Sequence, residues 1–439
     1  MRLNLNREQI YESIIHYYNN NYKHKEFIPG ISKVNYAGRV FNQEELLYAV
    51  DAVLDYWLTE GRFSEDFSYK LSKYLNIDNI ILTNSGSSAN LLALSALTSN
   101  KLLDKRLVPG DEVITVAAAF PSTVVPIIQN NLIPVFVDIE LGTYNINVNK
   151  IEQGLSNKTK CIILSHTLGN PFNKEAVTNL SRKYGLWLIE DNCDALGSIY
   201  QERKTGTFGD ISTMSFYPAH HITTGEGGAI ACNDDNLAMI IKSFRDWGRD
   251  CYCSGGESNT CGKRFTQQFG KLPYGYDHKY VYSELGYNLK MTDIQAAIGS
   301  AQMDKLPSFV EKRKLNYCKW NNVFKEYDNY FILPNATDYS EPAWFAYPLT
   351  VKRDAPFSRD NITTYLNSNL IETRNMFAGN IIRQPSFMNT KYRVSGTLKN
   401  TDVVMNSTFF LGTYPGLTQE MIDYTIEKIE FYLDKFNNV

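Results

Sequence analysis

The chain has 439 residues, of which 43% are apolar and 21% charged, and its 44 Lys and Arg residues nearly balance 47 Asp and Glu residues. This is the composition of an ordinary globular protein, and the length predicts one large domain and a smaller one. A net charge of −3 argues against a polyanion-binding surface, so no nucleic acid partner is expected. The opening residues lack the apolar core of a signal peptide, and no apolar run is long enough to span a membrane. We therefore expect a cytoplasmic protein with no membrane partner.

Helical patterns open the chain and then alternate with short apolar runs. Residues 7–21, 43–58 and 64–75 have helical periodicity. From about residue 80, the alternation predicts strands at 112–116, 135–138, 161–165, 186–190, 213–216 and 228–231, with helices near 87–98, 122–130, 173–184 and 235–247. This pattern is typical of an α/β protein with a mostly parallel sheet and helices on both faces. Functional sites in such sheets lie beyond the carboxyl ends of the strands.

The last third of the chain predicts a smaller C-terminal α+β domain. A helical pattern over 292–327 resembles a connection, and it precedes a strand at 345–351 and helices near 360–370 and 418–436. The expected organisation is an N-terminal helical segment over 1–40, a large domain over 41–305 that holds the functional loops, and a small domain over 306–439.

Four segments combine into a candidate cofactor site. Residues 84–90 (NSGSSAN) open a helix whose free N–H groups suit a phosphate, although alone they are as readily a plain helix cap. Residues 188–191 (LIED) form an apolar strand that ends in two acids, where a carboxylate could pair with a protonated pyridine nitrogen or simply cap the strand. The other two segments are 215–228 (SFYPAHHITTGEGG) and 286–293 (GYNLKMTD).

In this order, the four segments resemble the DegT/DnrJ/EryC1/StrS sugar aminotransferase family, from about residue 40 to the end of the chain. The resemblance implies a fold type I PLP-dependent transferase. In that family the third segment carries a lysine that holds pyridoxal phosphate as a Schiff base, and here His220 stands at that position. An imidazole cannot form that bond but can act as a general base near neutral pH. The implied cofactor is therefore pyridoxamine phosphate held without a covalent bond. His221 is the alternative base.

The resemblance also assigns contacts to the cofactor. Asp191 matches the acid that pairs with the ring nitrogen, and Phe120 matches the aromatic residue that stacks on the ring. Asn288 matches a residue that reaches the phosphate from a partner subunit, which implies a homodimer. Asp194 stands where the family usually has glutamine, and the sequence gives no reason for that change. The phosphate contacts implied by the resemblance are Ser87, Ser88 and Ser215.

Three of the seven cysteines lie close together in a segment rich in glycine and polar residues, at Cys251, Cys253 and Cys261, and Cys193 lies upstream. Four thiolates suffice for a [2Fe–2S] cluster, but the spacing is not the common ferredoxin one, so zinc and no metal remain open on these residues alone. Because Cys193 follows Asp191 by two residues, a strand-like backbone would turn both side chains to one face and place the cluster near the cofactor ring.

The sequences SFYPAHHIT, FRDWGRDCYC and CGKRF resemble one branch of the family, the dehydrases of CDP-4-keto-6-deoxyglucose. The branch implies a CDP-sugar substrate, a [2Fe–2S] cluster on the four cysteines, and electrons from an NADH-dependent flavin reductase, in the synthesis of 3,6-dideoxyhexoses for lipopolysaccharide. Arg383 is the candidate substrate contact in the region that resembles the sugar-nucleotide site. The alternatives are a cluster-free dehydrase of GDP-4-keto-6-deoxymannose and a non-catalytic relative that binds zinc or senses redox state.

Overall fold

The computed structural model of the chain describes residues 6–22, 26–253 and 257–437. Its centre is an eight-stranded sheet in the order β1-β9-β8-β5-β4-β2-β3-β14. The bounds are β1 Asn79–Thr83, β2 Glu112–Val116, β3 Ile133–Val137, β4 Thr159–Ser165, β5 Trp187–Asp191, β8 Ile211–Ser215, β9 Gly228–Cys232 and β14 Arg393–Val394. All pairs from β8 to β14 are parallel, and β9 runs antiparallel to both of its neighbours. The predicted mostly parallel sheet is confirmed.

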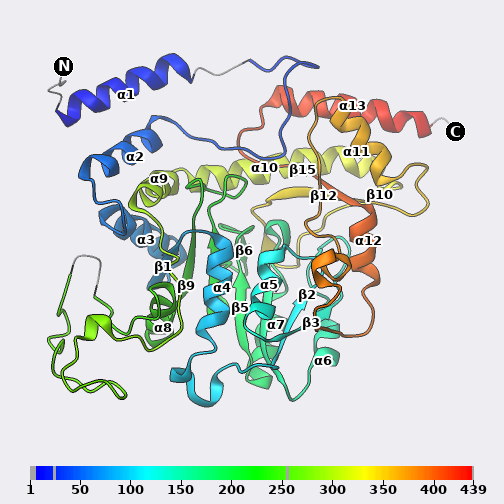
Figure 1. The fold of residues 1–439 in the computed structure, drawn as a ribbon. Coiled ribbons are helices and arrows are strands. Elements are labelled where there is room, and N and C mark those ends of the chain that lie inside the picture. The colour runs from blue at the N-terminus through cyan, green and yellow to red at the C-terminus, as the bar shows by residue number, and fades with distance from the viewer. Residues whose placement is uncertain (1–5, 23–25, 254–256, 438–439) are drawn as a thin grey trace.

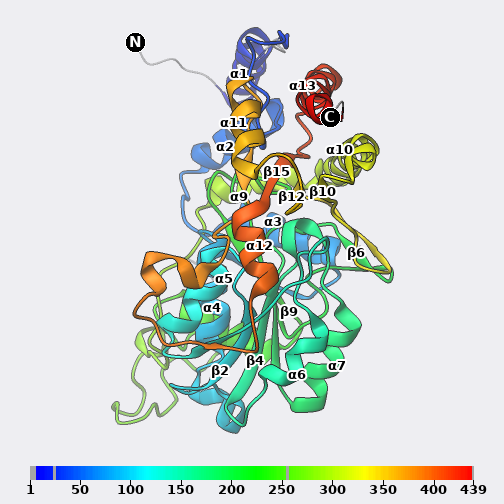
Figure 2. The same cartoon turned by 90° about the vertical axis from the view of Figure 1, so that its right-hand side faces the viewer.

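Helices cover both faces of this sheet (Figures 1 and 2). Helices α4 (Gly86–Ala96) and α5 (Pro121–Gln129) lie on one face, and α6 (Ile151–Gly154) and α7 (Lys174–Tyr184) on the other (Figure 2). The strands β2 and β9 are fully buried because both faces are covered, which explains their continuous apolar sequences. The register pairs Ser165 with Asp191 and Asp191 with Thr213, so the carboxyl ends of these strands meet at one edge.

A smaller part follows, built on the four-stranded antiparallel sheet β10-β12-β15-β13. Its strands are Phe331–Ile332, Ala346–Val351, Thr408–Gly412 and Arg374–Asn375, and its helices include α11 (Arg359–Ser368) and α13 (Gln419–Asn437). The expected C-terminal α+β part is therefore present, with an aromatic-rich core of its own. The predicted division at residue 306 stays a prediction.

The chain returns from the small part to the large sheet, which the sequence pattern did not indicate. β14 adds to β3 as a parallel strand, and Arg393 in it contacts Glu112 of β2 at 2.7 Å. Two other differences are local. The pattern over 292–327 is two helices, α9 (Asp293–Met303) and α10 (Leu306–Phe324), because proline begins the second. β1 was absent from the predicted strands.

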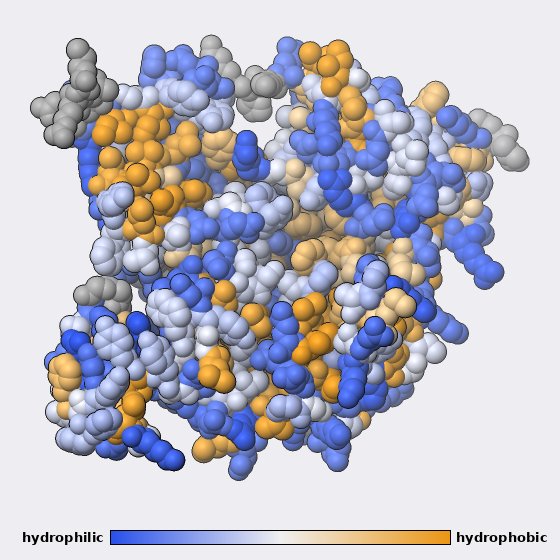
Figure 3. All heavy atoms as spheres, viewed as in Figure 1, coloured by the Kyte–Doolittle hydropathy of each residue, from blue (hydrophilic) through white to orange (hydrophobic). Residues whose placement is uncertain are grey.

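The N-terminal helix α1 (Arg7–Asn21) lies over α2 (Gln43–Asp55), where Arg7 pairs with Asp51 at 2.8 Å. Helices α3 (Arg62–Leu75) and α8 (Asp235–Arg245) flank the β1 edge of the sheet. Among the described residues, no helix is both long enough and apolar enough to cross a membrane. Between α8 and α9, residues 250–253 and 257–285 form a lobe that projects from this edge (Figures 1 and 3).

Candidate active site and cysteine lobe

The start of α4 forms a turn rich in serine at the carboxyl end of β1. Ser85 caps the helix, and its Oγ accepts a hydrogen bond from the Ser88 backbone N–H at 3.1 Å. Ser87 is exposed, Ser88 is half-buried, and the half-buried Ser215 lies directly against the turn. A Cβ at Gly86 would lie 2.4 Å from the Ser215 Cβ, so glycine is needed for this approach. The three serines assigned to a phosphate thus lie around one helix N-terminus.

Asp191 is buried at the end of β5, in a position suited to a cationic ring nitrogen. Its Oδ2 accepts hydrogen bonds from the Asn90 amide at 2.8 Å and the Thr123 hydroxyl at 2.7 Å, and its Oδ1 accepts from the Cys193 backbone N–H at 3.2 Å. These three neutral donors orient the carboxylate. The Thr213 hydroxyl donates in turn to the side-chain carbonyl oxygen of Asn90 at 2.6 Å.

His220 lies near this carboxylate, and the carboxyl group of Asp194 is also close to its ring. The His220 Nδ1 is 3.4 Å from the Asp194 Oδ1, which is long for a hydrogen bond, and within the described residues this buried nitrogen has no hydrogen-bond partner. Burial lowers the pKa of His220 to about 4, although the charge of Asp191 opposes it. Burial, reinforced by Asp191, raises the pKa of Asp194 to about 8. At neutral pH the imidazole is neutral and able to accept a proton.

Hydrogen bonds from Arg313 support the backbone of the turn that carries His220. The buried Arg313 of α10 donates hydrogen bonds to the carbonyl oxygens of Ala219 at 3.2 Å and His220 at 2.9 Å. His221 points the other way: it is buried, and its Nε2 lies 2.7 Å from the Ala343 carbonyl oxygen. This geometry favours His220 over His221 as the residue that faces the pocket.

The remaining predicted contacts lie at the surface of the chain. Phe120 is 53% exposed and packs edge to face against Phe377, with its ring free on the pocket side. Asn288 is exposed and forms a backbone bridge with Asp246. Arg383 is exposed and pairs with Asp402 at 3.3 Å, so nothing in the geometry fixes it toward the pocket.

The structure brings together three of the four selected cysteines. Cys251, Cys253 and Cys261 line one small cavity in the lobe, together with His278. Cys193 lies in the pocket beside Asp191, and its thiol does not line that cavity. Among the described residues, no group of three His, Cys, Asp or Glu side chains has the geometry of a metal site. Four cysteines of one chain therefore do not fit a single cluster.

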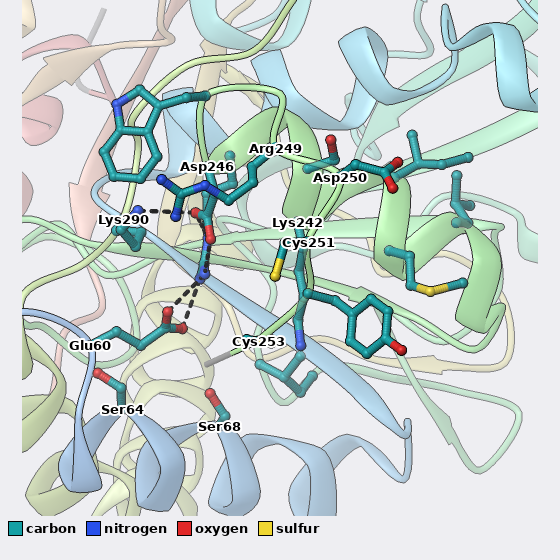
Figure 4. Close-up of a pocket in the computed structure, with 18 of the residues that line it drawn as sticks. Glu60, Ser64, Ser68, Lys242, Asp246, Arg249, Asp250, Cys251, Cys253 and Lys290 are labelled. Carbon is teal, nitrogen blue, oxygen red and sulfur yellow. Dashed lines mark hydrogen bonds and ion pairs between the residues drawn. The ribbon is translucent and has the colours of Figure 1, made fainter. Parts of the chain in front are cut away.

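A larger cavity of about 1260 Å³ opens beside the lobe and shares Cys251 and Cys253 with it (Figure 4). Its floor is an ionic network in which Arg245 contacts Glu60 at 2.8 Å and Asp246 at 2.8 Å. Lys290 also contacts Asp246, at 3.3 Å, so two cations and two carboxylates are paired at the base of the lobe.

Comparison with known proteins agrees with this geometry. The DegT/DnrJ/EryC1/StrS aminotransferase family matches residues 41–430, and the chain belongs to that family. It is 54% identical over 430 residues to the lipopolysaccharide biosynthesis protein RfbH of Salmonella typhimurium strain LT2, with 98% of each chain covered. It is 46% identical over 409 residues to a dTDP-4-dehydro-2,6-dideoxy-D-glucose 3-dehydratase of Saccharopolyspora spinosa, covering 93% of this chain and 88% of that one.

Solved structures give the same result. The chain resembles an Escherichia coli GDP-4-keto-6-deoxy-D-mannose-3-dehydratase with bound hydrated PLP, at a TM-score of 0.80 and 26% identity, covering 90% of this chain and all of that one. The predicted fold type I architecture and the resemblance to the sugar 3-dehydrase branch are thereby confirmed.

Sequence reasoning missed four side chains of the site. Asn90 and Thr123 hold Asp191, and Arg313 holds the His220 turn, but polar residues inside apolar helices signal this only weakly. Asp194 was noted as a departure without a role, and its proximity to His220 supplies one.

Proposed function

We propose that this protein is a pyridoxamine-phosphate-dependent dehydrase that removes the 3-hydroxyl from a nucleotide-linked 4-keto-6-deoxyhexose. One observation carries the proposal: a neutral histidine occupies the lysine position, in the pocket and beside the Asp191 carboxylate. Two of the relatives described above are named as 3-dehydratases of nucleotide-linked keto sugars, which supports the same reaction.

The residues fit this cofactor. The turn at Ser85–Ser88 offers hydroxyls and N–H groups to a phosphate, and the buried Asn84 Oδ1 has no hydrogen-bond partner among the described residues. Asp191 would pair with the ring nitrogen, and the exposed face of Phe120 would stack on the ring. When bound, the cofactor supplies a primary amine for the 4-keto group and a ring that withdraws electrons.

The chain's own residues then manage charge and protons. Asp191, oriented by the Asn90 and Thr123 donors, would accept a hydrogen bond from a protonated ring nitrogen and so strengthen the electron withdrawal. His220 accepts a proton at an imidazole nitrogen as general base, and it can return that proton to the departing hydroxyl. Arg313 fixes the backbone on which the imidazole stands, so that the base is already oriented.

The finer assignments belong to this proposal. The substrate is CDP-4-keto-6-deoxyglucose, on a route to 3,6-dideoxyhexoses of lipopolysaccharide, and the enzyme works as a cytoplasmic homodimer in which Asn288 reaches the partner's phosphate. The [2Fe–2S] cluster and an NADH-dependent flavin reductase would supply electrons after dehydration. Because one chain does not gather the four cysteines, no reductive step is derived through the cluster here.

A second candidate is a cluster-free dehydrase of GDP-4-keto-6-deoxymannose. The solved structure with a TM-score of 0.80 favours it, as does the separation of Cys193 from the other three cysteines. Such an enzyme would need no iron and no reductase. Comparing CDP-, dTDP- and GDP-linked keto sugars in the assay below separates the candidates.

The test uses reversible dehydration, which needs no reductase. Holoenzyme reconstituted with pyridoxamine phosphate is incubated with CDP-4-keto-6-deoxyglucose in oxygen-labelled water, and label in the 3-hydroxyl is read from mass-spectrometric fragments. Wild type should exchange this oxygen. His220→Asn should retain cofactor affinity and lose exchange by about a hundredfold or more, whereas the control His16→Asn, on exposed α1, should match wild type. Exchange by His220→Asn at the wild-type rate would refute the base assignment.

A further inference from the structure

The three thiols of the lobe are arranged as a partial ligand set. The Cys253 Sγ lies 3.0 Å from the Thr260 hydroxyl, and the Cys261 Sγ accepts a hydrogen bond from the Lys263 backbone N–H at 3.4 Å. Together with Cys251, these two cysteines line one small cavity, which His278 also lines. All three side chains are half-buried and remain accessible.

The position of Cys251 is fixed by its neighbour Asp250. The Asp250 backbone N–H donates to the Val281 carbonyl at 2.9 Å, and its carboxylate contacts Lys101 at 2.9 Å and His278 at 2.8 Å. These contacts close the base of the lobe and hold it against the outer edge of the sheet. The cavity beside Cys251 is lined by Ile80 of the edge strand β1.

Cys193 of the same chain lies elsewhere. It follows β5, which is separated from β1 by β9 and β8. Strands in a sheet are about 4.8 Å apart, so three spacings amount to about 14 Å. The same large cavity reaches Trp187 at the amino end of β5, whereas Cys193 follows the carboxyl end. The contacts of Asp250 hold the base of the lobe, and Cys193 does not line the cavity that the three lobe cysteines share.

Apolar surface around the base of the lobe is suited to a second copy of this chain. Trp57 and Trp247 line the large cavity with Cys251, and both are more than 40% exposed. Leu285, near Asn288, is 94% exposed, and Figure 3 shows further apolar surface over α2. Contiguous exposed apolar surface of this kind marks an interaction site.

From this separation we propose that the cluster site is formed between two subunits: Cys251, Cys253 and Cys261 come from one, and the fourth ligand is the partner subunit's Cys193. The inference rests on the proposed function. It also connects two separate features. The Asp246–Asn288 bridge joins the base of the lobe to Asn288, the residue proposed to reach the partner's phosphate. Cys193 lies two residues after Asp191, the residue proposed to pair with the cofactor ring. A two-fold dimer would hold two equal sites.

The test is complementation between two defective chains, expressed together with different tags and purified anaerobically as the mixed dimer. Cys193→Ser and Cys253→Ser homodimers should each lose the cluster. Their mixed dimer should contain one intact site of two, with about half of the wild-type iron and sulfide and the visible and paramagnetic spectra of the reduced cluster. A mixed dimer of Cys253→Ser with Cys261→Ser has no intact site in either arrangement and should remain iron-free. Cys318→Ser, which changes an exposed cysteine outside the site, should keep full iron.

The outcomes separate the inference from the proposed function. If the mixed dimer contains no iron while a doubly tagged wild-type dimer does, the shared site is overturned, and the proposal that the protein holds a cluster stands. A wild type that takes up no iron after reconstitution would overturn the cluster itself. Retention of iron by Cys193→Ser, with its loss in His278→Ala, would make His278 the fourth ligand and also overturn the inference, since the buried His278 Nδ1 has no hydrogen-bond partner among the described residues. Cofactor affinity and thermal unfolding verify that each variant is folded.

Discussion

Replacement of Asp194 by asparagine tests how the structure sets the strength of the His220 base. Below a pH of about 8 the carboxyl is protonated, so an amide of similar shape leaves the charge of the pair unchanged. Above that pH the wild-type carboxylate stands 3.4 Å from the imidazole. At an effective dielectric constant of about 20, the attraction between unit charges at this distance is about 5 kcal/mol. That energy corresponds to about three and a half powers of ten in the basicity of His220.

The wild-type exchange rate should therefore rise as the pH increases through about 8, when ionised Asp194 converts His220 into a stronger base. Proton transfer recovers only part of a gain in basicity, so we expect an increase of roughly tenfold. The Asp194→Asn enzyme should match wild type near neutral pH and lack the increase. Label exchange into the 3-hydroxyl across the alkaline range measures both profiles. Identical profiles for the two enzymes would refute the coupling between Asp194 and His220.

Two further predictions concern binding and stability. Gly86→Ala places a Cβ in contact with Ser215 at the phosphate turn, so its affinity for pyridoxamine phosphate should fall at least about tenfold in a fluorescence titration, and unchanged affinity would contradict the assigned phosphate site. Arg393→Gln removes the two hydrogen bonds to Glu112, at 3.0 and 2.7 Å, and should lower the free energy of unfolding by about 1–2 kcal/mol near neutral pH. Burial raises the pKa of Glu112, but Arg393 and nearby hydroxyls outweigh it and the net pKa is lowered. The stabilisation is thus present above the ordinary glutamate pKa and is lost as pH falls through the lowered value, so the two proteins should converge in acid.

Much of the large domain could be predicted because its signals are local. The buried parallel strands are continuous apolar runs, and β2 was predicted with its observed bounds, Glu112–Val116. Cys193 does lie next to Asp191, but it stands in the turn after β5 and not in the strand-like backbone from which that proximity was predicted. β14 has only two residues and forms because Arg393 finds Glu112 across the fold, which no window of sequence displays.

The cysteines also show that contacts between distant residues cannot be predicted from local sequence. Spacing indicated four thiols but could not show that Asp250, through Lys101 and His278, fixes three of them at the sheet edge. The role of Asp194 likewise depends on how the His220 turn folds onto β5. Long-range contacts decide both.

The lobe is built as an addition to the cofactor pocket. The segments that enter and leave the lobe are joined by isolated bridges at Arg249–Tyr282 and Asp246–Asn288, so they lie side by side at its base. Among the described residues, the hydrogen bonds to the Asp191 carboxylate and to the His220 turn come from α4, α5, α10 and the turn after β5. The residues proposed for dehydration are therefore supported independently of the lobe. Under the proposed shared site, electrons from the cluster would reach these residues through the partner subunit's Cys193.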